Sequence, residues 1–151
     1  MIWLTLACTG DPDTGSDDAV DTAEHDTAAA PTMLISGYNS DAVHHIDPTA
    51  GVLLSVIEGI AGAQSVRPMG DGLVAVAEKD GVLVRLSGDP LAATEIVTGL
   101  SNPTAAIAVD KALLVAEFSA DRILRLDAGT GEVLSVVAEE LPGPDAGMLL
   151  E

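Results

Sequence analysis

Short apolar runs separated by polar turn residues fill the second half of the chain. Between residues 104 and 138 the runs are TAAIAVD, ALLVAE, RILRLD and EVLSVVA, separated by K, FSAD and AGTG. Runs of this length, rich in Val, Ile and Leu and bounded by Gly and Asp, are typical of β-strands joined by tight turns. No segment of useful length has a helical period. The pattern therefore predicts an all-β domain.

The same pattern is repeated along the chain. Residues 34–57 align without a gap with residues 114–137, and the aromatic Tyr38 falls on the aromatic Phe118. A third copy lies midway, since Arg85 and Leu86 match Arg125 and Leu126. The unit is about 40 residues long and holds four predicted strands, which is the size and content of one β-propeller blade.

Residues Asn102 to Val133 resemble an NHL-type propeller repeat. Such repeats have a Pro before the innermost strand, an apolar-Asp ending, a second strand that closes on Ala and an acid, and an Arg-led third strand. The matching residues are Pro103, Asp110, Ala116 with Glu117, and Arg122. The resemblance implies a β-propeller of about three four-stranded blades over residues 33–151.

The phase of the repeat predicts an incomplete ring. Residues 33–57 supply strands two to four of a blade, residues 63–98 and 103–138 supply two complete blades, and DAGMLLE begins a further innermost strand. Propellers close with typically four to eight blades, so a sheet edge and an apolar blade face should stay open. Two explanations remain: the chain is part of a longer gene product, or two three-blade chains self-associate into a six-blade ring.

The first 32 residues predict the location of the protein in the cell. MIWLTLAC, residues 1–8, resembles a bacterial lipoprotein signal segment, in which Cys8 would be lipidated. The alternative is an ordinary N-terminus with a buried cysteine. Residues 9–32 hold seven acids and no Lys or Arg, which is typical of an extended, disordered tether. We expect a lipid-anchored, extracytoplasmic protein of the bacterial cell envelope.

Composition narrows the functional classes. The chain has six Lys and Arg and 24 Asp and Glu, which gives a formal net charge of −18. This charge argues against nucleic-acid binding, because few cations are present to neutralise phosphates. Aromatic residues make up 2%, so small aliphatic side chains must fill the core. A single cysteine excludes an internal disulfide and a Cys-rich zinc site.

Three residues are candidate metal ligands. Glu78 and Glu117 are placed at the end of a second strand, and Asn102 lies in the loop before an innermost strand. Carboxylate and amide oxygens suit Ca²⁺. Regucalcin-like lactonases hold a metal with acids and an amide on such a face, so that resemblance implies a metal-dependent lactonase- or lyase-like enzyme. The other interpretation is that these are solvated loop acids or turn residues.

The remaining polar residues predict structure rather than chemistry. His44 and His45 are neighbours in a predicted strand and point to opposite faces, so we expect His44 in the core with a hydrogen-bond partner and His45 exposed. Asp47 and Asp127 precede PTAG and AGTG, where an acid caps a tight turn.

No catalytic residue is assigned. The sequence contains no G-x-S-x-G elbow, Walker loop or dinucleotide fingerprint. We therefore favour a noncatalytic, surface-tethered module that binds a protein or small ligand, with the metal-dependent enzyme as the alternative.

Overall fold

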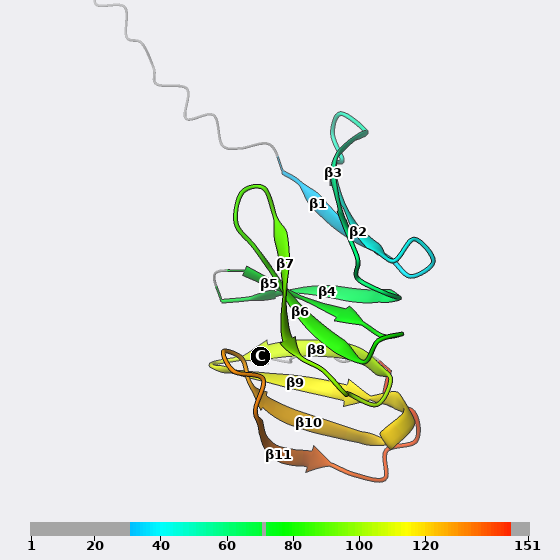
Figure 1. Cartoon of the computed structure of the whole chain (residues 1–151), viewed down its shortest axis with the longest axis vertical. Helices are drawn as coiled ribbons and strands as arrows, with labels where there is room; N and C mark the ends of the chain where they lie inside the picture. The colour runs from blue at the N-terminus through cyan, green and yellow to red at the C-terminus, as the bar shows by residue number, and fades with distance from the viewer. Residues whose placement is uncertain (1–30, 71, 146–151) are drawn as a thin grey trace, which may run out of the picture.

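The computed structural model describes residues 31–70 and 72–145 of the chain. In this part the chain folds into three antiparallel sheets, and one 3₁₀ turn, η1 (Phe118–Ala120), is the only helical element there. Figure 1 shows the sheets following one another in chain order. The predicted all-β class is confirmed.

Each sheet corresponds to one unit of the repeat and is called a blade here. Blade 1 has three strands: β1 (Met33–Gly37), β2 (Ala42–Asp47) and β3 (Val52–Glu58). Blade 2 has four: β4 (Ala63–Met69), β5 (Gly72–Ala77), β6 (Val82–Ser87) and β7 (Ala92–Val97). Blade 3 also has four: β8 (Pro103–Val109), β9 (Ala112–Glu117), β10 (Arg122–Asp127) and β11 (Val133–Ala138). Consecutive strands pair side by side within each blade.

The strand register confirms the predicted phase. The second strand of a blade ends opposite the start of the third, in the equivalent pairs Gly37 with Ala42, Ala77 with Val82, and Glu117 with Arg122. Strand β1 is therefore the equivalent of β5 and β9. Among the described residues, blade 1 has no counterpart of the first strands β4 and β8.

The inner strands of neighbouring blades lie against one another. Strand β4 lies against β8, and β1 lies against β4, so blade 2 separates blade 1 from blade 3. This order agrees with Figure 1, where β4 to β7 lie between the other two sheets. The loops at the two ends of the blades are thereby gathered into two opposite faces.

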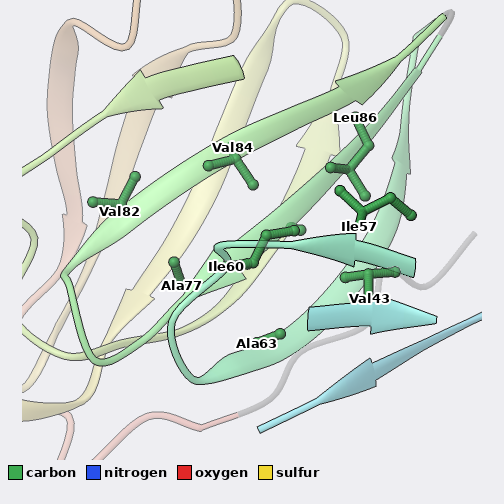
Figure 2. Close-up of a cluster of buried hydrophobic side chains, with 9 residues drawn as sticks. Val43, Ile57, Ile60, Ala63, Ala77, Val82, Val84 and Leu86 are labelled. Carbon is green, nitrogen blue, oxygen red and sulfur yellow. The ribbon is translucent and has the colours of Figure 1, made fainter. Parts of the chain in front are cut away.

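Two hydrophobic cores hold the blades together. The core between blades 1 and 2, drawn in Figure 2, includes Val43, Ile57, Ile60 and Leu86. The core between blades 2 and 3 includes the fully buried Leu83, Leu113 and Leu126. Apart from Pro103, the buried apolar side chains of the described residues are Ala, Val, Leu, Ile or Met, as the shortage of aromatic residues predicted.

Candidate functional site

One end of the molecule repeats the same loop arrangement three times. It consists of the turns that follow the second strands (38–41, 78–81 and 118–121) and the connections that leave the outermost strands (59–62, 99–102 and 139–143). We call this end the crossover face. A backbone N–H of each connection donates to a turn carbonyl: Ile60 to Asp41 at 3.0 Å, Leu100 to Gly81 at 3.0 Å and Leu141 to Asp121 at 2.9 Å.

Two of these turns also use a carboxylate to hold the connection. Oδ1 of Asp41 accepts from the Gly62 N–H at 2.8 Å, and Oδ1 of Asp121 accepts from the Gly143 N–H at 2.9 Å. Both aspartates have positive φ, a conformation that Asp tolerates better than most residues. The identity of Asp41 and Asp121 in the repeat therefore reflects a structural role, in which each anchors the start of the following unit.

Lys79 adds an ion pair to the first of these turns. Its Nζ donates to Asp41 Oδ1 at 2.6 Å and to the Tyr38 carbonyl at 3.2 Å, and it lies 4.9 Å from the centroid of the Tyr38 ring. The hydrogen bond from Lys79 is the main cause that lowers the pKa of Asp41, followed by the Gly62 N–H. The sequence offered no signal for Lys79, because its partners lie 38 and 41 residues away.

Glu117 is a buried structural acid at this face. Its side chain is 1% exposed, Oε1 accepts from the Ser101 N–H at 2.6 Å, and Oε2 accepts from Nε of Arg122 at 2.5 Å. The carboxylate thus links the 99–102 connection to the start of β10. A buried charge is tolerated when it is paired and hydrogen-bonded, as it is here.

Glu78 and Glu117 are not equivalent, in contrast to the placement expected from the sequence. Glu117 is the last residue of β9, whereas Glu78 lies one residue beyond β5. The backbone bonds agree, since the Glu78 N–H donates to Gly62 O as the Phe118 N–H donates to Asn102 O. Glu78 is therefore the counterpart of Phe118, and successive residues of an extended chain point to opposite sides.

Glu78 and Asn102 occupy the positions that an aromatic residue and a glycine occupy in the other two units. Asn102 has a φ of 53°, and its counterparts Gly62 and Gly143 have similar positive values. A Cβ on Gly62 would lie 3.1 Å from the Tyr38 ring, and one on Gly143 would lie 2.8 Å from the Phe118 ring. Two units thus pack an aromatic ring on a glycine, and the middle unit has Glu78 and Asn102 in place of that pair.

The calcium assignment to Glu78, Glu117 and Asn102 stays a prediction. The structure brings Asn102 and Glu117 to the same loop cluster, since the Glu117 carboxylate binds Ser101 N–H and Asn102 O accepts from Phe118 N–H. Over residues 31–70 and 72–145, no three His, Cys, Asp or Glu side chains are grouped closely enough to hold a metal ion. Glu117 would have to give up existing hydrogen bonds to act as a ligand.

The structure confirms the turn caps predicted for Asp47 and Asp127, but not the burial predicted for His44 or the exposure predicted for His45. Nε2 of His44 lies 2.9 Å from Ser40 Oγ, the expected hydrogen-bond partner, although the ring is only half-buried. His45 is half-buried rather than exposed. Oδ1 of Asp47 accepts from the N–H groups of Thr49 and Ala50 at 2.8 and 2.9 Å, so the turn cap is confirmed.

The equivalent cap in blade 3 is also present. Oδ1 of Asp127 accepts from the Gly129 N–H at 2.9 Å and from the Thr130 N–H at 2.8 Å. The bond from Thr130 N–H is the largest cause that lowers the pKa of Asp127. This turn lies on the face opposite the crossover face.

The signal-like segment 1–8 with Cys8, and residues 9–30 of the tether, lie outside the described residues. In the part of the chain that is described, no helix has the length and hydrophobicity to span a membrane.

No protein-family model matches the chain, and no curated protein matches its sequence. Solved structures do match its fold. The computationally designed Ika8 protein aligns with a TM-score of 0.61 and 15% identity over 80% of this chain. Glutaminyl cyclase from Myxococcus xanthus aligns with a TM-score of 0.53 and 10% identity over 72%, and BamB from Moraxella catarrhalis with 0.50 and 18% over 71%.

These matches cover 37% of the Ika8 chain, 49% of the glutaminyl cyclase chain and 34% of the BamB chain. At such identities the similarity shows the fold and not the activity. The described residues form three antiparallel sheets at the spacing of the sequence repeat, and these sheets align with solved β-propeller structures. The chain has a β-propeller fold, of which the described residues form three consecutive blades.

Proposed function

We propose that the chain is a noncatalytic binding module that takes a positively charged segment of a partner protein, or a small cationic ligand, at its crossover face. A lipid on Cys8 and the tether of residues 9–32 would hold it at the bacterial cell envelope. The observation that carries the proposal is the charge distribution over the crossover face.

The crossover face holds more acids than its cations neutralise. Its two cations, Lys79 and Arg122, are each bound to a carboxylate, that of Asp41 and that of Glu117. The acids that remain in these loops or directly beside them are Glu58, Glu78, Asp80, Asp121, Glu139 and Glu140. A surface with one sign of charge attracts ligands of the opposite sign and speeds their association.

Two shallow cavities lie among these acids. A cavity of about 490 Å³ is lined by Ala120, Asp121, Arg122, Glu139, Glu140 and Pro142. A second, of about 270 Å³, has Glu58, Asp80 and Glu95 in its lining together with aliphatic residues of blade 2. Each offers three carboxylates beside apolar surface, which suits the charged head and aliphatic stem of a Lys or Arg side chain.

A labelled oligolysine peptide tests the proposal by fluorescence anisotropy. Replacing Glu139→Gln together with Glu140→Gln should weaken binding by about fivefold, because two surface charges contribute roughly 1 kcal/mol in total. The matched control, Asp89→Asn with Glu132→Gln, removes the same charge from the opposite face and should leave affinity near that of the wild type. Equal weakening by both double variants would mean that only overall charge attracts the peptide.

The metal-dependent alternative has a separate test. Calcium titration by isothermal calorimetry should show no site with a Kd below about 1 mM, the weak end of protein calcium sites. Tight binding that is lost in Asn102→Ala would favour the lactonase- or lyase-like enzyme instead.

The anchor is tested by fractionation. Cys8→Ser should move the protein from the membrane fraction to the soluble fraction, because the tether has no apolar segment of its own. Unchanged membrane association of this variant would contradict the proposed anchor.

A further inference from the structure

Strand β1 has an unused edge beside a groove. It is the edge strand of blade 1, and among the described residues only β2 pairs with it. Beside it lies a groove of about 310 Å³, lined by residues 34–36 of β1 and 64–67 of β4. Within the groove, Ser65 Oγ is buried, and no hydrogen-bond partner for it lies among the described residues. In blades 2 and 3 the corresponding edge of the second strand is paired with the innermost strand.

One face of β1 is also exposed where its counterparts are buried. Ile35 is 45% exposed, whereas the equivalent Ala75 and Val115 are 0% exposed. Ala75 belongs to the core with blade 1, and Val115 to the core with blade 2. Ile35 therefore faces the place that a preceding blade would occupy. A large apolar side chain in that position indicates a surface that another sheet covers.

The repeat continues past blade 3. Leu141 and Gly143 make the same bonds to Asp121 that Ile60 and Gly62 make to Asp41. In addition, Thr104 Oγ1 donates to the Pro144 carbonyl at 2.9 Å, which places Pro144 beside β8. The spacing that relates Gly143 to Asn102 then aligns residues 144–150, PDAGMLL, with β8.

We propose that two copies of this chain associate head to tail, with residues 144–150 of each copy entering the groove of the other as the missing innermost strand. The segment cannot serve its own chain in this way, because Pro144 lies at blade 3 and blade 2 separates it from β1. Two copies would complete six blades, which is within the range of closed propellers.

The repeat also specifies the register of the added strand. In blade 3, Ala106 lies opposite Val115, and both are 0% exposed. The corresponding pair across the two copies is Gly147 and Ile35. Association would cover Ile35 and satisfy the free backbone groups of β1, and both changes favour strand addition at a sheet edge.

Mass measurement by light scattering gives the first test. The chain should have twice the 15.3 kDa of one copy, and deletion of residues 146–151 should return it to the monomer. A monomeric full-length chain, or a dimer that persists after the deletion, would overturn the proposal. Circular dichroism of the deletion variant verifies that its sheets remain folded.

Disulfide trapping in a Cys8→Ser background tests the register. Mixing Ile35→Cys chains with Gly147→Cys chains should give a covalent dimer, because directly opposed strand residues have Cα atoms close enough for a disulfide. Replacing the Ile35→Cys partner by Thr94→Cys, which is exposed on β7, should give none. A disulfide within one chain between Asp26→Cys and Ile35→Cys would show that the tether fills the groove, and would overturn the proposal.

Discussion

At the scale of single residues, Glu117 is a buried carboxylate. The free-energy cost of burying it depends on the neighbours that bind it. Its carboxylate is satisfied by one backbone N–H and by Arg122, whose side chain is 39% exposed. The acid therefore depends on a cation that solvent can reach. The same contacts give the acid at the end of β9 a structural role, which links the 99–102 connection to β10.

Arg122→Ala should lower the free energy of unfolding by about 3 kcal/mol, because removal of one partner leaves a buried charge unpaired. Urea denaturation of the variant measures the loss. Arg125→Ala is the matched control, since Arg125 is exposed on the same strand, and its change should stay within about 0.5 kcal/mol. Similar losses in both variants would contradict the role given to Arg122.

The turn cap formed by Asp127 makes the stability of the folded protein depend on pH. Hydrogen bonds from Thr130 and Gly129 lower its pKa in the folded state, so the folded protein binds this proton less readily than the unfolded chain. The resulting stabilisation is present above the unfolded pKa of about 3.9 and is lost as pH falls through the lower folded value.

The difference in unfolding free energy between wild type and Asp127→Asn should therefore be larger at pH 6 than at pH 2.5. Urea denaturation at both values measures it, and taking the difference cancels the contribution of the other acids. A difference that is the same at both pH values would contradict the proposed coupling.

At the scale of elements, two turns with the same conformation have different surroundings. Gly51 and Gly131 both end turns after an Asp cap, with φ of 68° and 74°. A Cβ on Gly51 would meet nothing within 4 Å, whereas one on Gly131 would clash with the Ile96 carbonyl oxygen. The turn after β10 is thus packed against blade 2, and the turn after β2 is open.

Gly51→Ala should cost about 1 kcal/mol, the conformational penalty for a positive φ. Gly131→Ala should cost at least about 2 kcal/mol, because the clash with blade 2 adds to the same penalty. Thermal and urea unfolding of the two variants compare the costs. If Gly51→Ala proves the more damaging, the packing assigned to the second turn is wrong.

The strands of one blade also differ in how much they stabilise it. Leu126 of β10 is 0% exposed, and Leu134 of β11 is 52% exposed. Leu126→Ala should cost about 3 kcal/mol through lost burial and a cavity, and Leu134→Ala less than about 1 kcal/mol. Chemical denaturation tests both. Nearly equal costs would show that β11 is covered in solution.

At the scale of the whole molecule, charge opposes folding. The net charge of −18 lies on a chain of 151 residues, and self-repulsion destabilises a compact state. Raising NaCl from about 10 mM to 0.5 M should raise the unfolding temperature, because screening shortens the range of this repulsion. Differential scanning calorimetry measures the shift, and a falling midpoint would mean that attractive ion pairs outweigh the repulsion.

The fold could be predicted from the sequence to the level of blades and their phase. The strand runs, the 40-residue spacing and the Asp-capped turns depend on residues close together in the chain, and the structure confirms them. The candidate site could be predicted only in part. The loops that hold Asn102, Glu78 and Glu117 were located from the sequence, and the strand register revealed the one-residue difference between the two acids.

The alignment of Tyr38 with Phe118 already contained the signal for that correction, because Glu78 lies midway between them. The Lys79–Asp41 pair and the Arg122–Glu117 pair have no comparable signal. The repeat shows which positions of different units are equivalent. It does not show which side chains are in contact.

By itself, the sequence determined the all-β class, the period, the turn chemistry and the acidic charge, because each follows from local residue type and spacing. Only the tertiary structure decided that the Glu117 carboxylate is buried and hydrogen-bonded, that Lys79 of blade 2 pairs with Asp41 of blade 1, and that β1 has an open edge beside a groove. These features depend on contacts between residues far apart in the chain, and such contacts exist only once the blades pack together.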